Sequence, residues 1–134
     1  MYMPDNAVKK ILIADDEPTL VSTLQYNLER EGYSVVIATD GEAAVAAARE
    51  SHPDLIVLDI MMPRLNGLEV CRILRREMHV PIVILSARGD ERDRAAGVEA
   101  GADDYVTKPF RMGELIARIG LLLLRSECLP PPDK

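Results

Sequence analysis

The sequence predicts an α/β fold in which five parallel strands form one doubly wound sheet with helices on both faces. Short apolar runs alternate with longer amphipathic segments along the 134 residues, strand then helix, five times over. The short runs are rich in β-branched residues and continuously apolar, which is typical of strands buried on both faces of a parallel sheet. Right-handed crossovers between such strands place helices on both faces.

The predicted strands are short, and the last is the weakest. They cover Ile11–Ile13, Val35–Ile37, Leu55–Leu58, Ile82–Leu85 and Tyr105–Val106. The segments between them have the apolar spacing of helices. The first helix begins near Pro18 and ends before Gly32, the second follows Asp40 as its N-cap, and the others cover about Leu68–Met78, Arg92–Ala100 and Met112–Arg125.

Composition and charge restrict what this chain can do. The formal net charge is −6, so the chain has no general electrostatic footprint for nucleic acid, and contact with DNA would need an attached domain. No apolar run is long enough to span a bilayer, and the first residues lack the apolar stretch of a signal peptide. The sequence therefore predicts a cytoplasmic location without membrane contact.

The chain length suits one domain. We expect an N-terminal extension over residues 1–7, a folded domain over 8–126 and a linker over 127–134. The linker is expected because Pro130–Pro132 cannot continue a helix. It would lead toward a further domain in a longer protein.

Polar side chains follow the predicted strands at the points where these end. Asp15 and Asp16 follow the first strand, Asp59 the third, Ser86 the fourth and Lys108 the fifth. The carboxyl ends of parallel strands share one edge of the sheet, where open α/β sheets bind ligands. These five groups are therefore expected to converge.

Three carboxylates at one edge repel one another unless a cation offsets their charge. Oxygen ligands without Cys or His neighbours favour a hard ion, which predicts Mg²⁺. A carboxylate can also be the nucleophile that forms an acyl phosphate, and phosphoryl transfer depends mainly on positioning and charge neutralisation. Asp59 is the best candidate for that nucleophile because the run before it, Leu55–Leu58, is expected to be a central strand.

The five groups lie within longer motifs. In chain order these are Ile13–Glu17, Asp54–Pro63, Asn66–Gly67, Leu85–Ala87 and Lys108–Phe110. Together they resemble the receiver domain of response regulators in bacterial two-component signalling, over about residues 8 to 126. The resemblance implies a flavodoxin-like sheet of five strands in the order 2-1-3-4-5 with five helices. It also implies a switch rather than an enzyme: the domain takes a phosphoryl group from a histidine kinase, catalyses that transfer itself and loses the group slowly.

The resemblance implies a role for each group around the metal. Asp59 is the phosphoacceptor. Asp16 binds Mg²⁺ directly, together with the Asp59 carboxylate and the backbone carbonyl of Met61, and Asp15 acts mainly through ordered water. Lys108 pairs with Asp59 and later with the phosphoryl group.

The resemblance also implies a switch. Ser86 and Ala87 contact the phosphoryl group, and Ser86 moves toward it on activation. Tyr105 is the aromatic switch residue and turns inward in the active state. The Lys108–Pro109 peptide bond is expected to be cis.

The segment Gly101–Phe110 resembles more specifically the winged-helix (OmpR/PhoB-like) subfamily, whose output is a DNA-binding domain. In that subfamily, active receivers form homodimers through the fourth helix, fifth strand and fifth helix. Two charge pairs match those across that interface: Arg94 with Glu114, and Asp104 with Arg118. Glu99 departs from the pattern because Gly120 stands in the place of its usual basic partner. Dimerisation need not fail for that reason, since single exposed pairs contribute little.

Each of these residues also has a simpler interpretation. Asp15 and Asp16 could cap the following helix, and Ser86 could cap a turn. Lys108 could be a solvated lysine and Tyr105 a core residue, and the charges of the predicted dimer face could be ordinary helix charges.

Three rival functions remain open at this point. A phosphohydrolase with an aspartate nucleophile would normally carry a second acid at position 61, where Met61 stands. A flavodoxin-like cofactor module would need a phosphate-binding loop after the first strand, where Asp15–Glu17 is acidic. A receiver-like domain that signals without phosphate is disfavoured by the complete acidic set.

Overall fold

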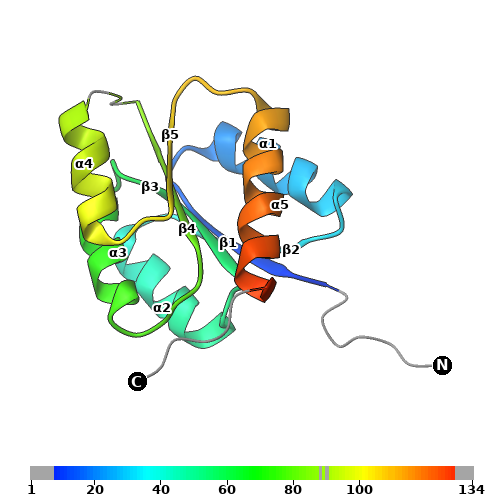
Figure 1. Ribbon diagram of the computed structural model, residues 1–134, viewed down its shortest axis with the longest axis horizontal. Coiled ribbons are helices and arrows are strands. Elements are labelled where there is room, and N and C mark those ends of the chain that lie inside the picture. The colour runs from blue at the N-terminus through cyan, green and yellow to red at the C-terminus, as the bar shows by residue number, and fades with distance from the viewer. Residues whose placement is uncertain (1–7, 88, 90, 129–134) are drawn as a thin grey trace.

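Five parallel strands form one sheet in the order β2-β1-β3-β4-β5 in the computed structural model (Figure 1). The structure describes residues 8–87, 89 and 91–128. The strands are β1 (Lys10–Ala14), β2 (Ser34–Ala38), β3 (Leu55–Asp59), β4 (Ile82–Ser86) and β5 (Asp104–Thr107). The predicted fold class and strand order are confirmed, with β3 at the centre of the sheet and β2 and β5 at its edges.

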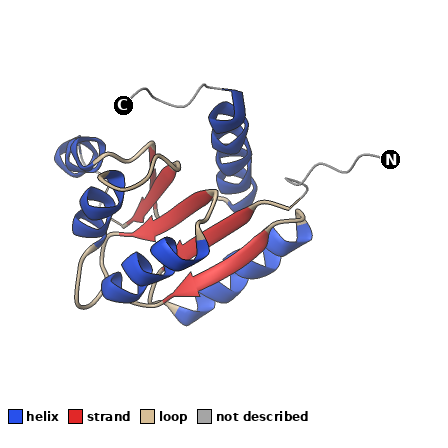
Figure 2. Ribbon diagram, turned by 90° about the horizontal axis from the view of Figure 1, so that it is seen from below, coloured by secondary structure: helices blue, strands red, loops and turns tan. Residues whose placement is uncertain are grey.

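Helices cover both faces of the sheet (Figure 2). On one face lie α1 (Pro18–Arg30) and α5 (Met112–Cys128). On the other lie α2 (Gly41–Ser51), α3 (Gly67–Arg75) and α4 (Glu91–Ala100). Among the described residues, no helix has the length and apolar character that crossing a membrane requires.

Side chains of successive strand residues alternate between two cores. In β1, Ile11 and Ile13 pack in the core under α1 and α5, whereas Leu12 and Ala14 pack in the core under α2 and α3. The side chains on both faces of these strands are buried. The sequences of β1, β3 and β4 are therefore continuously apolar and do not alternate with polar residues. The rigid centre of the sheet then fixes the positions of the residues that follow these strands.

Two helices end elsewhere than the apolar pattern predicts. Helix α3 ends at Arg75 rather than near Met78, and the guanidinium of Arg75 bonds the backbone oxygens of Met78 and Val80, so that the chain folds back over it. Helix α5 continues past Arg125 to Cys128, two residues beyond the predicted domain limit at 126. The extension and the proline segment, residues 1–7 and 129–134, lie outside the described residues.

Candidate functional site

Three carboxylates lie together at the carboxyl edge of the sheet. Asp15 and Asp16 follow β1 and Asp59 ends β3, and one oxygen atom of each lies within 4.8 Å of the others. Strands β1 and β3 are neighbours, with Ala14 opposite Leu58, so the residues that follow are placed side by side. Asp15 and Asp59 are only 1% and 5% exposed, whereas Asp16 is exposed and opens the cluster to solvent.

The ammonium group of Lys108, which follows the edge strand β5, reaches this cluster along the same carboxyl edge of the sheet. Its Nζ lies 3.7 Å from Asp15 Oδ2, 3.7 Å from Asp59 Oδ1 and 3.5 Å from Glu17 Oε1. The backbone N–H of Lys108 donates to the carbonyl of Ser86, and the Lys108–Pro109 peptide bond is cis. Lys108 is therefore a half-buried member of the site and not a solvated surface lysine.

Burial shapes the electrostatics of the site. Burial first, and then the charge of Asp15, raise the pKa of Asp59 to about 6, although Lys108 and the N–H of Met61 act in the opposite direction. Burial alone would lower the pKa of Lys108, but the charges of Asp59, Asp15 and Glu17 outweigh it and the pKa is raised. Three ionised carboxylates and one ammonium leave a local charge that a divalent cation would balance.

One oxygen of Asp15 is the clearest sign that the site is built for a ligand. Asp15 Oδ1 accepts a hydrogen bond from the N–H of Glu17, but Oδ2 is buried without a hydrogen-bond partner in the described part of the chain. Its ion pair with Lys108 Nζ, at 3.7 Å, is too long for a hydrogen bond, so this buried oxygen can still bind a metal cation or water. The N-cap of α1 is Glu17, so capping does not explain Asp15 or Asp16. An all-oxygen donor set of this kind suits Mg²⁺.

The loop after β3 approaches Asp59 closely. The N–H of Met61 donates to Asp59 Oδ1 at 3.3 Å, and the N–H of Gly67 donates to the carbonyl of Ile60 at 2.9 Å. A Cβ at position 67 would lie 2.3 Å from the carbonyl oxygen of Asp59, so only glycine fits. Asn66 caps α3 by accepting from the N–H of Glu69. The loop thus fixes the phosphoacceptor candidate and the adjacent backbone of Met61.

Comparison with known proteins decides the family. Residues 11–120 match the model of the response regulator receiver domain. The chain is a response regulator receiver domain. Its fold agrees with solved receivers: it has a TM-score of 0.85 and 36% identity to the receiver domain of the Francisella response regulator 1452, covering 88% of this chain and 98% of that one. The BeF3-activated N-terminal receiver domain of Klebsiella pneumoniae RstA is also similar, with a TM-score of 0.82 and 32% identity over 85% of this chain and 97% of that one.

The longer relatives carry names of transcriptional or DNA-binding regulators. The receiver domain is 52% identical to the alkaline phosphatase synthesis transcriptional regulatory protein PhoP of Bacillus subtilis, covering 94% of this chain and 53% of that protein. It is 46% identical to the DNA-binding response regulator MtrA of Mycolicibacterium smegmatis, covering 94% of this chain and 55% of that protein. The chain spans about half the length of the curated relatives it matches. These names agree with the subfamily that the sequence resembles.

The two predicted switch residues of the receiver domain are both buried. Ser86 ends β4 and is fully buried, and Ala87 follows it on the exposed side of the strand end. Tyr105 lies in β5 and is 4% exposed, so its ring points into the core shared with α4. Burial agrees with a core role for Tyr105 as well as with the inward position of the predicted switch.

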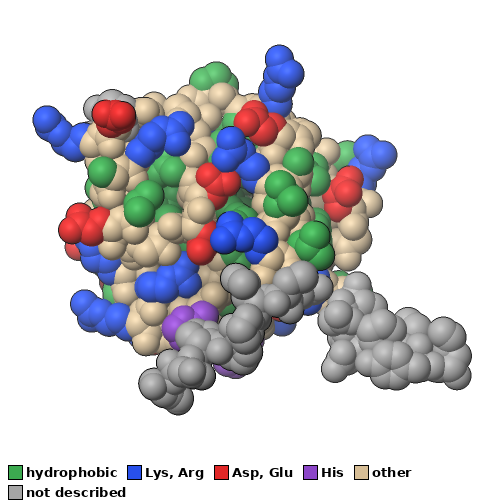
Figure 3. Space-filling view, viewed as in Figure 1, with side chains coloured by type: hydrophobic (Ala, Val, Ile, Leu, Met, Phe, Trp, Pro, Cys, Tyr) green, Lys and Arg blue, Asp and Glu red, His purple; other side chains and the backbone are tan. Residues whose placement is uncertain are grey.

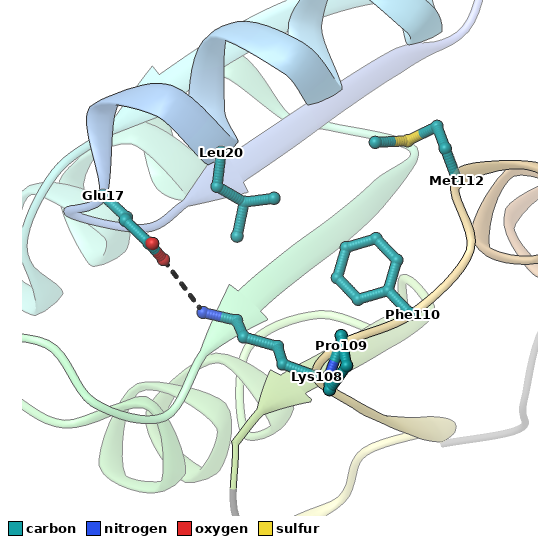
Figure 4. A pocket seen from close by; sticks show the side chains of 6 residues that line it. All are labelled: Glu17, Leu20, Lys108, Pro109, Phe110 and Met112. Carbon is teal, nitrogen blue, oxygen red and sulfur yellow. Dashed lines mark hydrogen bonds and ion pairs between the residues drawn. The ribbon is translucent and has the colours of Figure 1, made fainter.

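An apolar groove of about 280 Å³ opens beside Lys108 (Figure 4). Its walls come from the start of α1 and from the segment between β5 and α5. They consist of Glu17, Leu20, Lys108, Pro109, Phe110 and Met112. Sequence reasoning missed Glu17, which pairs with Lys108 at the mouth of this groove. The acidic run Asp15–Glu17 is a signal that could have identified it.

The predicted dimer face carries charges of both signs between apolar side chains (Figure 3). Within one chain, Arg118 of α5 bonds both oxygens of Asp104 at 2.9 Å and Glu114 at 3.2 Å. Arg94 of α4 contacts Tyr105 and Thr107 of β5. Both helices therefore place an arginine against the edge strand of the receiver domain.

Proposed function

We propose that Asp59 accepts a phosphoryl group from the phosphohistidine of a histidine kinase. An oxygen of Asp59 attacks the phosphorus, the bond from phosphorus to the imidazole nitrogen breaks, and its electron pair stays on that nitrogen. The observation that carries the proposal is the cluster itself: three carboxylates within 4.8 Å beside a lysine at the carboxyl edge of a parallel sheet, one of them with a buried oxygen that has no hydrogen-bond partner among the described residues.

The metal assignment follows from the same cluster. Asp16, Asp59 and the backbone carbonyl of Met61 would hold Mg²⁺, with Asp15 acting mainly through water. When bound, the ion would neutralise charge on the transferred oxygens. Lys108 holds its positive charge between Asp15 and Asp59, where it can bind a phosphoryl oxygen after transfer. The side chain of Met61 is a 58% exposed thioether, which cannot act as the second acid of a phosphohydrolase.

Phosphorylation is proposed to shift an equilibrium between two conformers. Ser86 and Ala87 would contact the phosphoryl group, and Tyr105 would hold its inward position in the active conformer. The active receiver would then form a homodimer through α4, β5 and α5, using Arg94 with Glu114 and Asp104 with Arg118. Within one chain, Arg118 bonds Asp104 and Glu114, so pairing across the dimer would exchange these bonds for bonds to the second copy.

The output is proposed to be control of transcription. The names of the longer relatives and the fraction of those proteins that this chain covers support a DNA-binding domain elsewhere in the whole protein. Such a protein would act in the cytoplasm, where kinase and DNA are both accessible. The groove beside Lys108 offers the kinase an apolar surface next to the phosphoacceptor.

Sedimentation in the presence of Mg²⁺ and beryllofluoride tests the switch. We expect wild type to shift from monomer toward dimer and Asp59→Ala to stay unchanged. A Glu114→Gln, Arg118→Gln double variant should bind beryllofluoride but form less dimer. If wild type binds the mimic and stays monomeric, the proposed dimer is wrong, whereas failure to bind the mimic would contradict the phosphoacceptor itself.

A further inference from the structure

The loop between β3 and α3, residues 60–66, contacts the first turn of α2. We call it the β3–α3 loop. The N–H of Gly41, the first residue of α2, donates to the carbonyl oxygen of Pro63 at 3.3 Å. A Cβ added at Gly41 would overlap the carbonyl oxygen of Leu65 and would lie 2.5 Å from Leu65 Cβ. Any side chain at position 41 would therefore have to displace the loop or the helix.

This close approach, and not the backbone conformation, explains why glycine stands at position 41. In the described chain, the glycines with positive φ are Gly32 and Gly101, whereas Gly41 is an ordinary helical residue at the start of α2. Alanine is the better helix former at such a position. The gain from glycine at position 41 is therefore the room that it leaves for the β3–α3 loop.

The β3–α3 loop is also held at its ends and by its core side chains. The N–H of Gly67, at the start of α3, donates to the carbonyl oxygen of Ile60 at 2.9 Å. Met62 is buried and Leu65 is half-buried, and both pack in the core that also contains Ala44 of α2. The loop therefore cannot move away from α2 without losing buried contacts.

Ion pairs add little to the contact between the loop and α2. Arg64 lies 3.7 Å from Asp40 and 3.9 Å from Glu42, and its side chain is 64% exposed. Exposed pairs of this kind contribute little to stability. The backbone approach at Gly41 is thus the feature through which a substitution in α2 would disturb the loop most.

We propose that Gly41 positions the β3–α3 loop and thereby sets the affinity of the Asp59 site for Mg²⁺. Gly41 is a positioning residue in this scheme, which rests on the proposed function. The loop carries Met61, whose N–H donates to Asp59 Oδ1 at 3.3 Å and whose carbonyl is the proposed backbone ligand. The carboxylates of Asp16 and Asp59 are placed by β1 and β3, whereas the carbonyl of Met61 is placed by the loop. A displaced loop would therefore weaken the site through this one ligand.

Calorimetric titration with Mg²⁺ tests the proposal. Gly41→Ala should raise the Mg²⁺ dissociation constant about tenfold or more, the effect typical of a group that orients a metal ligand. Gly113→Ala is the matched control, because it also lies in the first turn of a helix and its Cβ would meet nothing within 4 Å. It should bind Mg²⁺ like wild type.

Leu65→Gly tests the same contact from the loop, should Gly41→Ala fail to fold. It leaves Gly41 unchanged but removes the side chain through which the loop packs in the core. This variant should also raise the Mg²⁺ dissociation constant. An unchanged constant would show that the position of the loop does not set the affinity, and would overturn the proposal.

The Mg²⁺ dependence of phosphorylation separates a displaced ligand from a general defect. With acetyl phosphate, Gly41→Ala should gain phosphoryl mass more slowly than wild type at limiting Mg²⁺ and about as fast at saturating Mg²⁺. The reason is that Asp59 and Lys108 keep their places at the ends of β3 and β5. An equal loss at both Mg²⁺ concentrations would indicate a general structural defect and contradict the positioning role.

Amide hydrogen exchange reports on the loop in the metal-free protein. The N–H groups of Met62 and Gly67 both donate to the carbonyl oxygen of Ile60. They should exchange about tenfold faster in Gly41→Ala than in wild type, whereas the N–H groups of β3 should keep their protection. Equal exchange in the two proteins would show that α2 does not position the loop.

The outcomes separate this inference from the proposed function. A folded Gly41→Ala protein that binds Mg²⁺ like wild type would overturn the inference and leave the phosphoacceptor assignment intact. A wild type that binds no Mg²⁺ would remove the metal site of the proposed function and this inference with it.

Discussion

Charged side chains at the amino edge of the sheet are paired within the protein, whereas those at the carboxyl edge are only partly paired. At the amino edge, Arg75 donates to the carbonyl oxygens of Gly101 and Val80 and to Asp103, all within 3.0 Å. Asp103 also accepts from the N–H of Ile82, and Lys10 bonds Asp54 and Ser51. These charges meet donors or acceptors of the protein itself.

At the carboxyl edge, the single ammonium group of Lys108 only partly offsets the negative charges around it. Asp15, Asp16 and Asp59 crowd together, one oxygen of Asp15 has no hydrogen-bond partner in the described chain, and the pKa of Asp59 is raised to about 6. We therefore expect the amino edge to stabilise the fold and the carboxyl edge to lower its stability until a ligand binds. Opposite responses to substitution at the two edges are therefore expected.

The largest effect is expected at the amino edge. Arg75→Ala should lower the free energy of unfolding by about 3 kcal/mol, because it leaves Asp103 and the part-buried carbonyls of Gly101 and Val80 without their charged donor. Urea unfolding measures this. Arg72→Ala, on the exposed side of the same helix, is the control and should change stability by less than about 0.5 kcal/mol. Equal effects of the two substitutions would contradict a stabilising role for this edge.

At the carboxyl edge the sign should reverse. In metal-free protein at about pH 8, Asp59→Asn should raise the free energy of unfolding by about 2 kcal/mol, because it removes a buried charge next to Asp15. Folding raises the pKa of Asp59 from 3.8 to about 6. Between these two pH values, native wild type therefore binds more protons than the unfolded chain. Below pH 3.8 wild type and Asp59→Asn should therefore have similar free energies of unfolding. As the pH rises through about 6, the free energy of unfolding of wild type should fall relative to that of Asp59→Asn.

Urea unfolding of both proteins across this pH range, with a chelator present, provides the measurement. Asp54→Asn at the amino edge is the matched control, because Asp54 accepts a hydrogen bond from the N–H of Lys10 and should give no gain. A loss of stability in Asp59→Asn at neutral pH would show that the carboxyl edge is not strained by its charges.

Mg²⁺ binding should offset part of the charge repulsion that lowers stability at the carboxyl edge. Mg²⁺ at about ten times its dissociation constant should stabilise wild type by about 1.4 kcal/mol, because only the native state assembles the ligands. Thermal unfolding against Mg²⁺ concentration checks this. Asp16→Asn should lose most of the response and Glu99→Gln, exposed on α4, should keep it. An equal response in Asp16→Asn would place the ion elsewhere.

The smallest effect concerns backbone strain in the loop after Asp59. Arg64 has φ 75°, a left-handed conformation that a Cβ disfavours, and pairs with Asp40 and Glu42 only at 3.7 and 3.9 Å. Arg64→Gly should be more stable than Arg64→Ala by about 1 kcal/mol, since both lose the weak ion pairs but only glycine loses the Cβ. Chemical unfolding of the two variants measures the difference, and equal stabilities would show that position 64 is unstrained.

The positions of the buried strands could be predicted from the sequence because they depend on the apolar pattern, whereas the strand order was implied by the family resemblance. The runs before Asp15, Asp59 and Ser86 predicted the central strands, and the family prediction is confirmed. The convergence of Asp15, Asp16, Asp59 and Lys108 followed from parallel strands sharing one edge. The role of each residue at that edge stays a prediction.

Long-range pairings could not be predicted in the same way. Arg75 is one of several charged residues along α3, and nothing local indicates that it bonds Gly101 and Asp103, 26 and 28 residues later. The same holds for Arg94 over the Tyr105 ring. The end of α5 was placed too early because the residues after Arg125 carry no apolar pattern and no proline before Pro130, so the sequence holds no clear stop signal there.

The most direct test of the central claim is the intact mass of the protein after incubation with acetyl phosphate. We expect wild type to gain the mass of one phosphoryl group when Mg²⁺ is present and to gain none when the ion is chelated. Asp59→Ala should gain none in either condition. A wild type that gains no mass with Mg²⁺, or an Asp59→Ala protein that gains as much as wild type, would contradict the assignment of Asp59 as the phosphoacceptor.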